Sequence, residues 1–335
     1  MKQPKLILFL FLVGFFNLCL TACNKEDDFF MDNPVEIVII DRGDSVIVDN
    51  NGDTTKHVHI IDTVKYVKKK QIVTDFDELS NDNIVVEKAF VMEKHINNSF
   101  QGLAIYKDYL FQTYHSKACV DVYDLTNNQF VFSMNQKAES NVHCNNVDFG
   151  NQFYEESDPF PLLYLEHRGT THKTSVYRIV KNDGEFSLQK VQTFNFSPCS
   201  WSITNNDSEN GYMYISHDRE GPTYYIAKIN IPDYNQGDLS VTLDTESCLE
   251  CFPVEDHTGK VGQDATIYKN KLFQLKGYSS EGELLIHDLK NHNLIISIDL
   301  RKVGISGEPE GIAWYKDHII ISNINGQVYN MYFVK

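Results

Sequence analysis

Basic residues are under-represented in this chain of 335 residues, with 30 Lys and Arg against 46 Asp and Glu. The formal net charge of −16 repels nucleic acid and anionic lipid surfaces, so we expect no nucleic-acid partner. Proline (9) and glycine (18) are too few for a collagen-like repeat, and a hydrophobic content of 42% argues against disorder. After the first 22 residues, no apolar run is long enough to form a membrane-spanning helix. The composition is that of a globular protein rich in Tyr (18) and Phe (21).

The N-terminus has the pattern of a secretory signal. Two lysines precede an apolar run from Leu6 to Leu20, which at about 1.5 Å per residue is too short to cross a bilayer core of roughly 30 Å. The run leads into the motif Leu-Thr-Ala-Cys, which ends at Cys23 and resembles a bacterial lipobox. The resemblance implies a lipoprotein signal peptide over residues 1–22 and acyl chains such as palmitate on Cys23. An ordinary signal peptide is the alternative.

Residues 24–28, Asn-Lys-Glu-Asp-Asp, place a lysine and an acidic run directly after this cysteine. The pattern resembles the export signal of Bacteroidota-type surface lipoproteins. The resemblance implies an outer-membrane lipoprotein that is exposed at the cell surface and meets the membrane through its lipid alone. A periplasm-facing protein, or a segment that is only a solvated linker, is the alternative.

Five cysteines remain in the body of the chain, and an odd number leaves at least one outside any intramolecular disulfide. Cys248 and Cys251 form a CxxC motif that suits a disulfide, a redox pair or half a zinc site. No second CxxC or His pair completes a metal set, so no metal is predicted there. Cys144 and Cys199 share one register, which would allow a contact or a bridge. The pairing of these four and of Cys119 stays open.

A repeat runs through the rest of the chain. Segments of 14 residues that begin at Gln101, Gln263 and Glu310 align without gaps. Each has a polar residue, an apolar strand, the step Tyr-Lys-Asp or Tyr-Lys-Asn, and a second apolar strand. The Asp or Asn of this step tolerates the backbone angles of a tight hairpin turn. Residues 120–131 match residues 284–295 and add two more strands, so each unit is predicted to be a four-stranded antiparallel meander.

Two less regular units begin at Asn145 and Ser200, so the first strands are spaced by 44, 55, 63 and 47 residues. Four strands per unit at this spacing predict an all-β fold, a β-propeller of five blades, with six as the alternative. Residues 240–245 are predicted to be the fourth strand of the unit that begins at Ser200. The last unit has three strands, and residues 84–92 are predicted to supply the fourth and close the ring.

These patterns divide the chain into a signal peptide (1–22), a lipid-anchored tail (23–83) and the propeller (84–335). The tail alternates apolar and polar residues, which predicts one or two β-hairpins. Asp44, Asp53 and Asp62 each precede Ser or Thr, which resembles the acceptor of Bacteroidota O-glycosylation. The resemblance implies a glycosylated tail, with chance occurrence of this short pattern as the alternative.

One polar residue begins the first strand of every blade. First strands line the central channel of a propeller, so these residues are predicted to form a ring at the channel mouth that binds a small polar ligand. The ring consists of Gln101, Asn145, Ser200, Gln263 and Glu310. The alternative is that a wet channel needs polar walls whatever its function.

Several residues near the ring are secondary candidates for binding or catalysis. They are Asp148, Asp264, Glu308, Trp201, Trp314 and His143. A glycosidase would need carboxylates that face one another. Strand alternation predicts that Asp264, one residue past the ring position, turns to the other face. No catalytic residue and no cofactor is therefore predicted, and the pattern leaves a bound calcium ion open.

The text of residues 99–114, SFQGLAIYKDYLFQTY, is similar to the opening blade of the five-bladed glutaminyl cyclotransferase propellers. Residues 307–322, GEPEGIAWYKDHIIIS, resemble the blade starts of SdiA-regulated and gluconolactonase-like propellers. The resemblance covers roughly residues 84–335 and implies the fold, while no catalytic motif carries over residue by residue. We therefore expect a surface module that binds a glycan, peptide or protein. An enzyme of cyclotransferase or hydrolase type, and a structural subunit of an envelope complex, are the alternatives.

Overall fold

The computed structural model describes most of the chain after residue 34. The described residues are 35–48, 54–68, 76, 79–115, 117–140, 143–167, 173–196, 201–217, 223–234, 240–243, 246, 248–255 and 258–334. They fall into two compact units, one over Met1–Val73 with Val334–Lys335 and one over Thr74–Phe333. The signal peptide, Cys23 and the acidic run after it lie outside the described residues.

The first unit contains one antiparallel hairpin, which agrees with the alternating pattern of the tail. Its strands are β1 (Val35–Val48) and β2 (Thr54–Lys68). The register pairs Val35 with Lys68 and Ser45 with Val58, with irregularities around Asp41.

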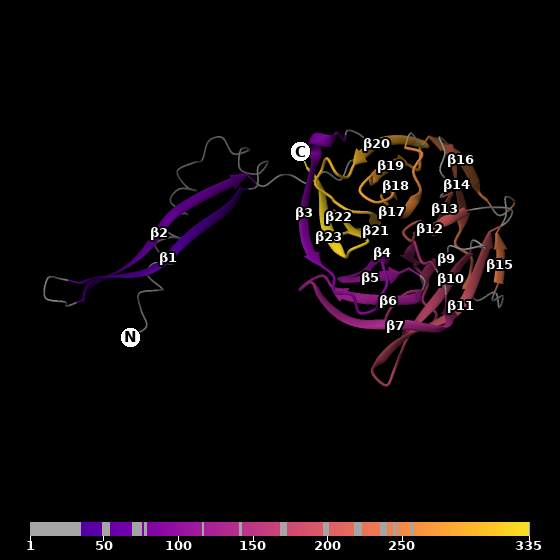
Figure 1. Ribbon diagram of the computed structural model, residues 1–335, viewed down its shortest axis with the longest axis horizontal. Helices are drawn as coiled ribbons and strands as arrows, with labels where there is room; N and C mark the ends of the chain where they lie inside the picture. The colour runs from indigo at the N-terminus through magenta and orange to yellow at the C-terminus, as the bar shows by residue number, and fades with distance from the viewer. Residues whose placement is uncertain are drawn as a thin grey trace. The chain divides into compact units, whose positions relative to one another are not determined.

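The second unit is a propeller of five blades arranged around a central axis (Figure 1). Blade 1 is β4 (Phe100–Tyr106), β5 (Tyr109–Tyr114), β6 (Lys117–Asp124) and β7 (Gln129–Ser140). Blade 2 is β8 (Val147–Phe149), β9 (Leu163–His167), β10 (Lys173–Asn182) and β11 (Glu185–Phe196). Blade 3 is β12 (Trp201–Asp207), β13 (Tyr212–His217), β14 (Thr223–Asn230) and β16 (Glu250–Glu255). Blade 4 is β17 (Gly262–Tyr268), β18 (Lys271–Lys276), β19 (Glu283–Asp288) and β20 (Asn293–Asp299). Blade 5 is β21 (Pro309–Tyr315), β22 (His318–Asn323), β23 (Gln327–Phe333) and β3 (Ile84–Val91), which follows the short 3₁₀ helix η1 (Asn81–Asn83). The predicted all-β propeller with five four-stranded blades is confirmed.

Apolar side chains between neighbouring blades form the core. Blades 1 and 2 share a cluster that includes Phe111, Val122, Leu163 and Ile179, all fully buried. Because each blade packs against a neighbour on both of its faces, both faces are buried. This explains why the second and third strands are the most continuously apolar parts of the repeat.

The closing strand comes from the other end of the chain, as predicted. Strand β3 pairs antiparallel with β23, with Val86 opposite Met331. The propeller unit begins at Thr74, however, and not at residue 84. Phe76, which the sequence assigns to the tail, is 1% exposed and meets the rings of Phe273, Trp314 and Phe333 edge-on at 5.4–5.7 Å. One aromatic side chain therefore fixes the incoming chain between blades 4 and 5.

The fourth strand of blade 3 is not where the sequence predicts it. Strand β15 (Ser240–Leu243) leaves blade 3 and pairs parallel with β11 at the outer edge of blade 2. The fourth strand of blade 3 is β16, which pairs antiparallel with β14 and contains Cys251 of the CxxC motif. Two apolar segments compete for one edge here, and alternation alone does not tell which sheet a strand joins.

The tight turns of the repeat also differ in detail from the prediction. Lys107, Lys269 and Lys316 have φ of 55°, 48° and 53°, and the Asn that follows Lys269 has φ of 58°. The lysine, and not the Asp or Asn alone, therefore adopts the left-handed conformation. Each lysine ammonium lies 4.5–5.4 Å from the ring of the tyrosine before it, which offsets part of the backbone cost by a cation–π contact.

Candidate functional site at the channel mouth

The first strands β4, β8, β12, β17 and β21 contact one another around the central axis. The face at which they begin is called the ring-bearing face below. Four of the five predicted ring residues are polar but buried: three are the second residue of an inner strand, and Asn145 lies two residues before β8. Gln101, Asn145 and Gln263 are 3% exposed and Glu310 is 2% exposed. Ser200 lies outside the described residues.

The ring on the side of blades 1 and 2 is a hydrogen-bonded arrangement of amides and imidazoles. Gln101 Nε2 donates to the Phe100 carbonyl (2.8 Å), which turns Gln101 Oε1 toward His143 Nε2 at 2.7 Å. Because Oε1 only accepts, His143 Nε2 is the donor of this hydrogen bond. The ring of His115 lies edge-on to that of His143 at 4.1 Å. Both imidazoles are partly exposed.

On the side of blades 4 and 5, one amide links two loops. Gln263 Nε2 donates to the Gly277 carbonyl (2.8 Å) and to Glu308 Oε1 (3.2 Å). Glu308 is partly exposed, and Tyr278, next to Gly277, is 52% exposed. The carboxylate of Glu308 and the backbone of the Gly277 loop are therefore held by the same ring residue.

Asn145 differs from the other ring residues. Its Oδ1 atom is buried and accepts no hydrogen bond from any residue that the structure describes. A buried acceptor without a donor costs free energy, and in native proteins a water or a ligand normally satisfies it. This side chain therefore marks a position where a donor from outside the chain is needed.

Asp264 lies at the channel axis, contrary to the strand-alternation argument. Its Oδ2 accepts from the backbone N–H groups of Leu103 (3.0 Å) and Ile312 (2.9 Å). Its Oδ1 accepts from Ala265 N (2.9 Å) and Asn146 Nδ2 (2.6 Å). One carboxylate thus joins blades 1, 2, 4 and 5. Burial raises the pKa of Asp264 well above its ordinary value, and these four donors oppose that rise.

Bulges explain why alternation fails at this level. The inner strands of blades 1, 4 and 5 each have a register shift at their start, between Phe100 and Leu103, between Gly262 and Ala265, and next to Gly311. An extra residue at each shift reverses the side that follows it. Blades 1 and 5 have glycine at the position of Asp264, and a Cβ at Gly102 would collide with the Asn145 carbonyl. Blade 2 has Asn146 at this position, and its side chain extends to Asp264.

Asp148 lies farther along the channel, away from the ring. Its Oδ2 accepts from Asn206 N of blade 3 (2.7 Å), and its Oδ1 accepts from Phe149 N (2.8 Å). Burial raises its pKa to about 7, although these two N–H groups oppose the rise. A side chain placed to hold blades 2 and 3 together does not face Asp264 or Glu310 as a catalytic partner would.

The raised pKa of Asp148 predicts a pH-dependent stability. Between about pH 4 and pH 7 the folded state keeps a proton that the unfolded state has released, so the free energy of unfolding falls as pH rises. Asp148→Asn removes this dependence and should gain up to about 4 kcal/mol relative to the native chain between pH 4 and pH 8. Denaturant unfolding at a series of pH values measures it. The exposed Asp82→Asn is the control, and parallel pH profiles for Asp148→Asn and the native chain would contradict the prediction.

The two tryptophans do not complete the mouth. Trp314 lies near the end of β21, at the opposite face, where it stacks on Tyr268 at 3.9 Å and donates from Nε1 to the Lys316 carbonyl. The backbone of Trp201 begins β12, and its side chain lies outside the described part of the structure. His115 and Tyr278 were missed by the sequence analysis. The signal that could have found them is their place directly after a second strand, since that loop returns to the ring-bearing face.

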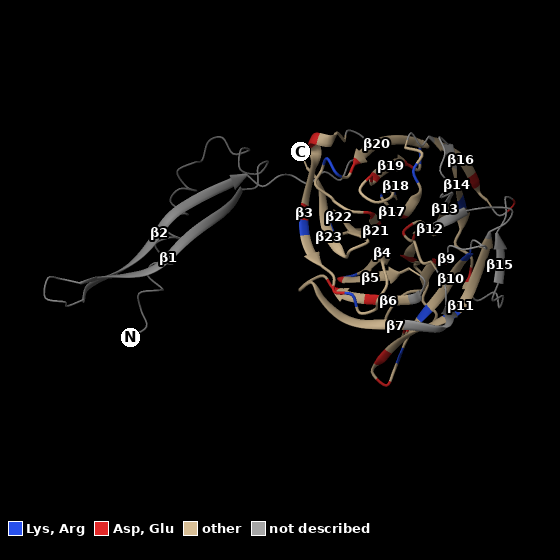
Figure 2. Ribbon diagram, viewed as in Figure 1, with Lys and Arg blue, Asp and Glu red and all other residues tan. Residues whose placement is uncertain are grey.

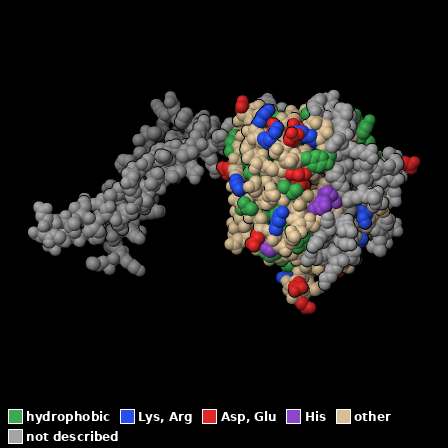
Figure 3. Space-filling model, viewed as in Figure 1, with side chains coloured by type: hydrophobic (Ala, Val, Ile, Leu, Met, Phe, Trp, Pro, Cys, Tyr) green, Lys and Arg blue, Asp and Glu red, His purple; other side chains and the backbone are tan. Residues whose placement is uncertain are grey.

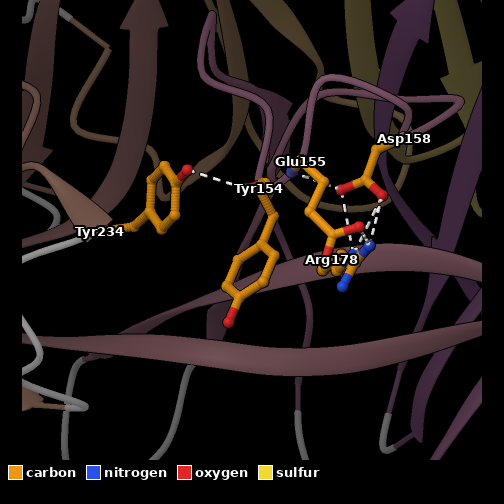
Figure 4. Close-up of polar contacts among 5 residues, drawn as sticks. All are labelled: Tyr154, Glu155, Asp158, Arg178 and Tyr234. Atoms are coloured by element: carbon orange, nitrogen blue, oxygen red, sulfur yellow. Dashed lines mark hydrogen bonds and ion pairs between the residues drawn. The ribbon is translucent and has the colours of Figure 1, made fainter.

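A second polar cluster lies at the opposite face, on the long connection between β8 and β9 (Figure 4). Arg178 binds Asp158 through Nε and Nη2 (2.7–3.1 Å), contacts Glu155 (2.8 Å) and lies over the ring of Tyr154 at 4.8 Å. Tyr234 donates its hydroxyl to the Tyr154 carbonyl (2.9 Å). Every charged group of the cluster is used to hold the loop, so we assign it a structural role.

No disulfide joins any two of the four described cysteines, Cys119, Cys144, Cys248 and Cys251. A bridge between Cys144 and Cys199 falls outside the described residues. Within the described ranges, no group of three or more His, Cys, Asp or Glu side chains is placed to hold a metal ion. None of the helical segments in that part of the chain has the length and apolarity of a membrane span.

Charged residues occur on strands and loops around the centre of the propeller as well as on its rim (Figure 2). On the face drawn in Figure 3, the coloured apolar side chains are scattered between charged ones and form no large patch. That distribution gives the described part of this face no sign of the extensive apolar contact expected of a structural subunit.

Comparisons with known proteins find only distant structural similarity. No protein-family model matches the chain, and no curated protein matches it significantly. Among solved structures, the chain is similar to a glutaminyl cyclase from Myxococcus xanthus (13% identity, TM-score 0.48, covering 75% of this chain and 98% of that one). It is also similar to a PQQ-bound aldose sugar dehydrogenase from Streptomyces coelicolor (8% identity, TM-score 0.47, 75% and 98% covered). A third is the β-propeller domain of Cps50 (Swd1) from Myceliophteria thermophila (11% identity, TM-score 0.42, 90% and 100% covered). The five-bladed β-propeller architecture of the chain follows from its own strand pairing.

Proposed function

We propose that this protein is a lipid-anchored propeller at the cell surface that binds a glycan, peptide or protein segment at its ring-bearing face. The sequence supports the anchor through the lipobox at Cys23 and the acidic run after it. In this proposal the acyl chains on Cys23 are the membrane anchor. Cys23→Ala removes the acylation site and should therefore move the protein out of the membrane fraction.

The observation that carries the binding proposal is the buried Oδ1 atom of Asn145 at the ring-bearing face, which has no hydrogen-bond donor among the described residues. Asp264 lies deeper, between the inner strands. Each oxygen of Asp264 accepts two hydrogen bonds from the protein, so the carboxylate has no hydrogen-bonding capacity to offer a reacting group. Glu308 and Asn145 lie between Asp264 and the ring-bearing face. Among the described residues, this face offers hydrogen-bond acceptors but no two facing carboxylates that could act as the acid and base of a hydrolase. Such a site suits binding better than hydrolysis.

Binding can be measured with the detergent-solubilised full chain immobilised and exposed to a pool of neutral oligosaccharides and a pool of synthetic tetrapeptides. We expect one pool to bind saturably. Asn145→Ala and Glu308→Gln should weaken that binding about tenfold or more, because each removes an acceptor or a charge at the mouth. Lys269→Ala, at the opposite face, is the control. Absence of binding, or equal binding by all variants, would contradict the proposal.

An enzyme acting at the same mouth is the alternative. His143 favours it, because its hydrogen bond to Gln101 holds an imidazole, the commonest general acid or base, beside the polar ring. Conversion of a bound probe into a product in the same assay, lost in His143→Gln, would establish catalysis.

A further inference from the structure

Phe76 is attached to the propeller through its side chain alone. Its ring is 1% exposed, whereas the described residues that follow it, from Leu79 to Val91, are all half-buried or exposed. The backbone of Phe76 makes no hydrogen bond with any residue that the structure describes. A segment held by one buried aromatic anchor resembles a docked peptide more than a strand of the core.

Four aromatic rings from two blades surround the Phe76 side chain. They are Tyr268 and Phe273 of blade 4 and Trp314 and Phe333 of blade 5. Each meets the Phe76 ring edge-on, with ring centroids 5.4–6.3 Å apart. Edge-to-face pairs at these distances are attractive beyond the apolar area that they bury, so the four rings form a pocket with a preference for an aromatic occupant.

The walls of this pocket also contact one another. Trp314 stacks on Tyr268 across the boundary between the blades, at 3.9 Å. Phe273 lies 5.6 Å from Trp314 and 6.3 Å from Phe333. None of these contacts passes through Phe76, so the pocket is arranged without its occupant, which lowers the entropy cost of binding. Tyr268 and Trp314 are partly exposed, so the pocket borders on solvent.

The ligand that matches this pocket is a phenyl ring on an acidic segment. Phe76 lies within the sequence Thr-Asp-Phe-Asp-Glu, residues 74–78, which has three acidic residues and no basic one. The ammonium of Lys269, an exposed residue, lies 5.4 Å from the ring of Tyr268, beside the pocket. A cation at this place complements acidic residues on either side of the phenyl ring.

We propose that the pocket between blades 4 and 5 is a binding site for a phenylalanine in an acidic peptide segment, and that residues 74–78 of this chain, the strap, occupy it as a detachable ligand. An occupant on the same chain competes at an effective concentration on the order of millimolar, so the strap keeps the pocket filled until a competing segment displaces it. Trp314 lies at the face opposite the ring, so this site is separate from the proposed binding function and goes beyond it.

Calorimetric titration of the detergent-solubilised full chain tests it, with the acetylated and amidated peptide Thr-Asp-Phe-Asp-Glu as the probe. Phe76→Ala empties the pocket, so this variant should bind the peptide at least about tenfold more tightly than the native chain, whose strap competes. The peptide Thr-Asp-Ala-Asp-Glu lacks the ring and should bind neither chain. Phe130→Ala, which removes a 37% exposed ring from the outer strand β7, is the matched control and should behave as the native chain does.

Phe76→Ala should remain folded, because β3 still pairs with β23 and the pocket walls still contact one another. A circular dichroism melt checks this. Phe76→Leu keeps an apolar side chain in the pocket, so its affinity for the peptide should lie between those of Phe76→Ala and the native chain.

Three results would overturn the inference. Loss of the folded propeller in both Phe76 variants would show that this ring belongs to the core. A folded Phe76→Ala chain that binds the peptide no better than the native chain would show that the pocket does not act as a site. If Glu308→Gln removes peptide binding from the Phe76→Ala chain, the peptide binds at the ring-bearing face, which supports the proposed function and contradicts this inference.

Discussion

Replacement of Asp264 by Asn should destabilise the propeller by at least about 3 kcal/mol, although the two side chains are nearly the same size. Both carboxylate oxygens of Asp264 accept from two donors each, three of them backbone N–H groups. An Asn side chain has one acceptor oxygen and one NH₂ group. Whichever way it turns, the NH₂ faces two buried donors, which lose their partner and repel it.

The effect should spread over four blades, because the donors come from blades 1, 2, 4 and 5. Asp288→Asn is a matched control. Asp288 also accepts four hydrogen bonds, but all come from Lys271, Lys290 and Asn291 of blade 4. Its amide would keep the two backbone donors, so about 1 kcal/mol is expected. Urea unfolding of the two variants measures the difference, and equal losses would show that Asp264 is not a joint between blades.

Removal of the closing strand should abolish the folded propeller. A chain that starts at Thr74 keeps β3 and Phe76, and we expect it to fold with a cooperative transition. A chain that starts at Met92 loses the strand that pairs with β23 from Ile84 to Val91. It exposes the edge of β23 and the aromatic cluster that Phe76 covers, so we expect an insoluble or molten product.

The separate contribution of Phe76 follows from a third chain. Phe76→Ala in the chain that starts at Thr74 should cost about 3–5 kcal/mol, the usual loss for a fully buried aromatic ring. Phe130→Ala, whose ring is 37% exposed, should cost much less. Soluble, cooperative unfolding of the chain that starts at Met92 would show that closure does not depend on β3.

The repeat explains how much of the fold could be predicted. The strand–turn–strand repeat is a local feature of the sequence, because pairing between neighbouring strands depends on residues a few positions apart. The blades that begin at Gln101, Gln263 and Glu310, and the closing strand at Ile84, are therefore correct within a residue or two. The positions of the ring residues could be predicted from the same register, because four of them lie within two residues of the start of an inner strand.

Other features depend on contacts between segments far apart in the chain. The choice between β15 and β16 as the edge of blade 3 is decided by which sheet has an open edge nearby, and both segments are apolar enough for either place. The position of Phe76 depends on a pocket built from blades 4 and 5. Nothing in the local text of the tail distinguishes it from the other apolar residues there.

The candidate site shows the same division. By itself, the sequence determined the five-bladed architecture and a polar residue at the start of each first strand, because both follow from local repeats. The tertiary structure alone decided that bulges direct the Asp264 side chain toward the channel axis. It also decided that Gln263 bonds both Glu308 and the Gly277 loop, and that Asn145 Oδ1 has no donor among the described residues. The reason is that hydrogen bonds across blades join residues more than a hundred positions apart, as between Asp264 and Leu103. A one-residue bulge that reverses a side chain also leaves no mark in a two-residue alternation.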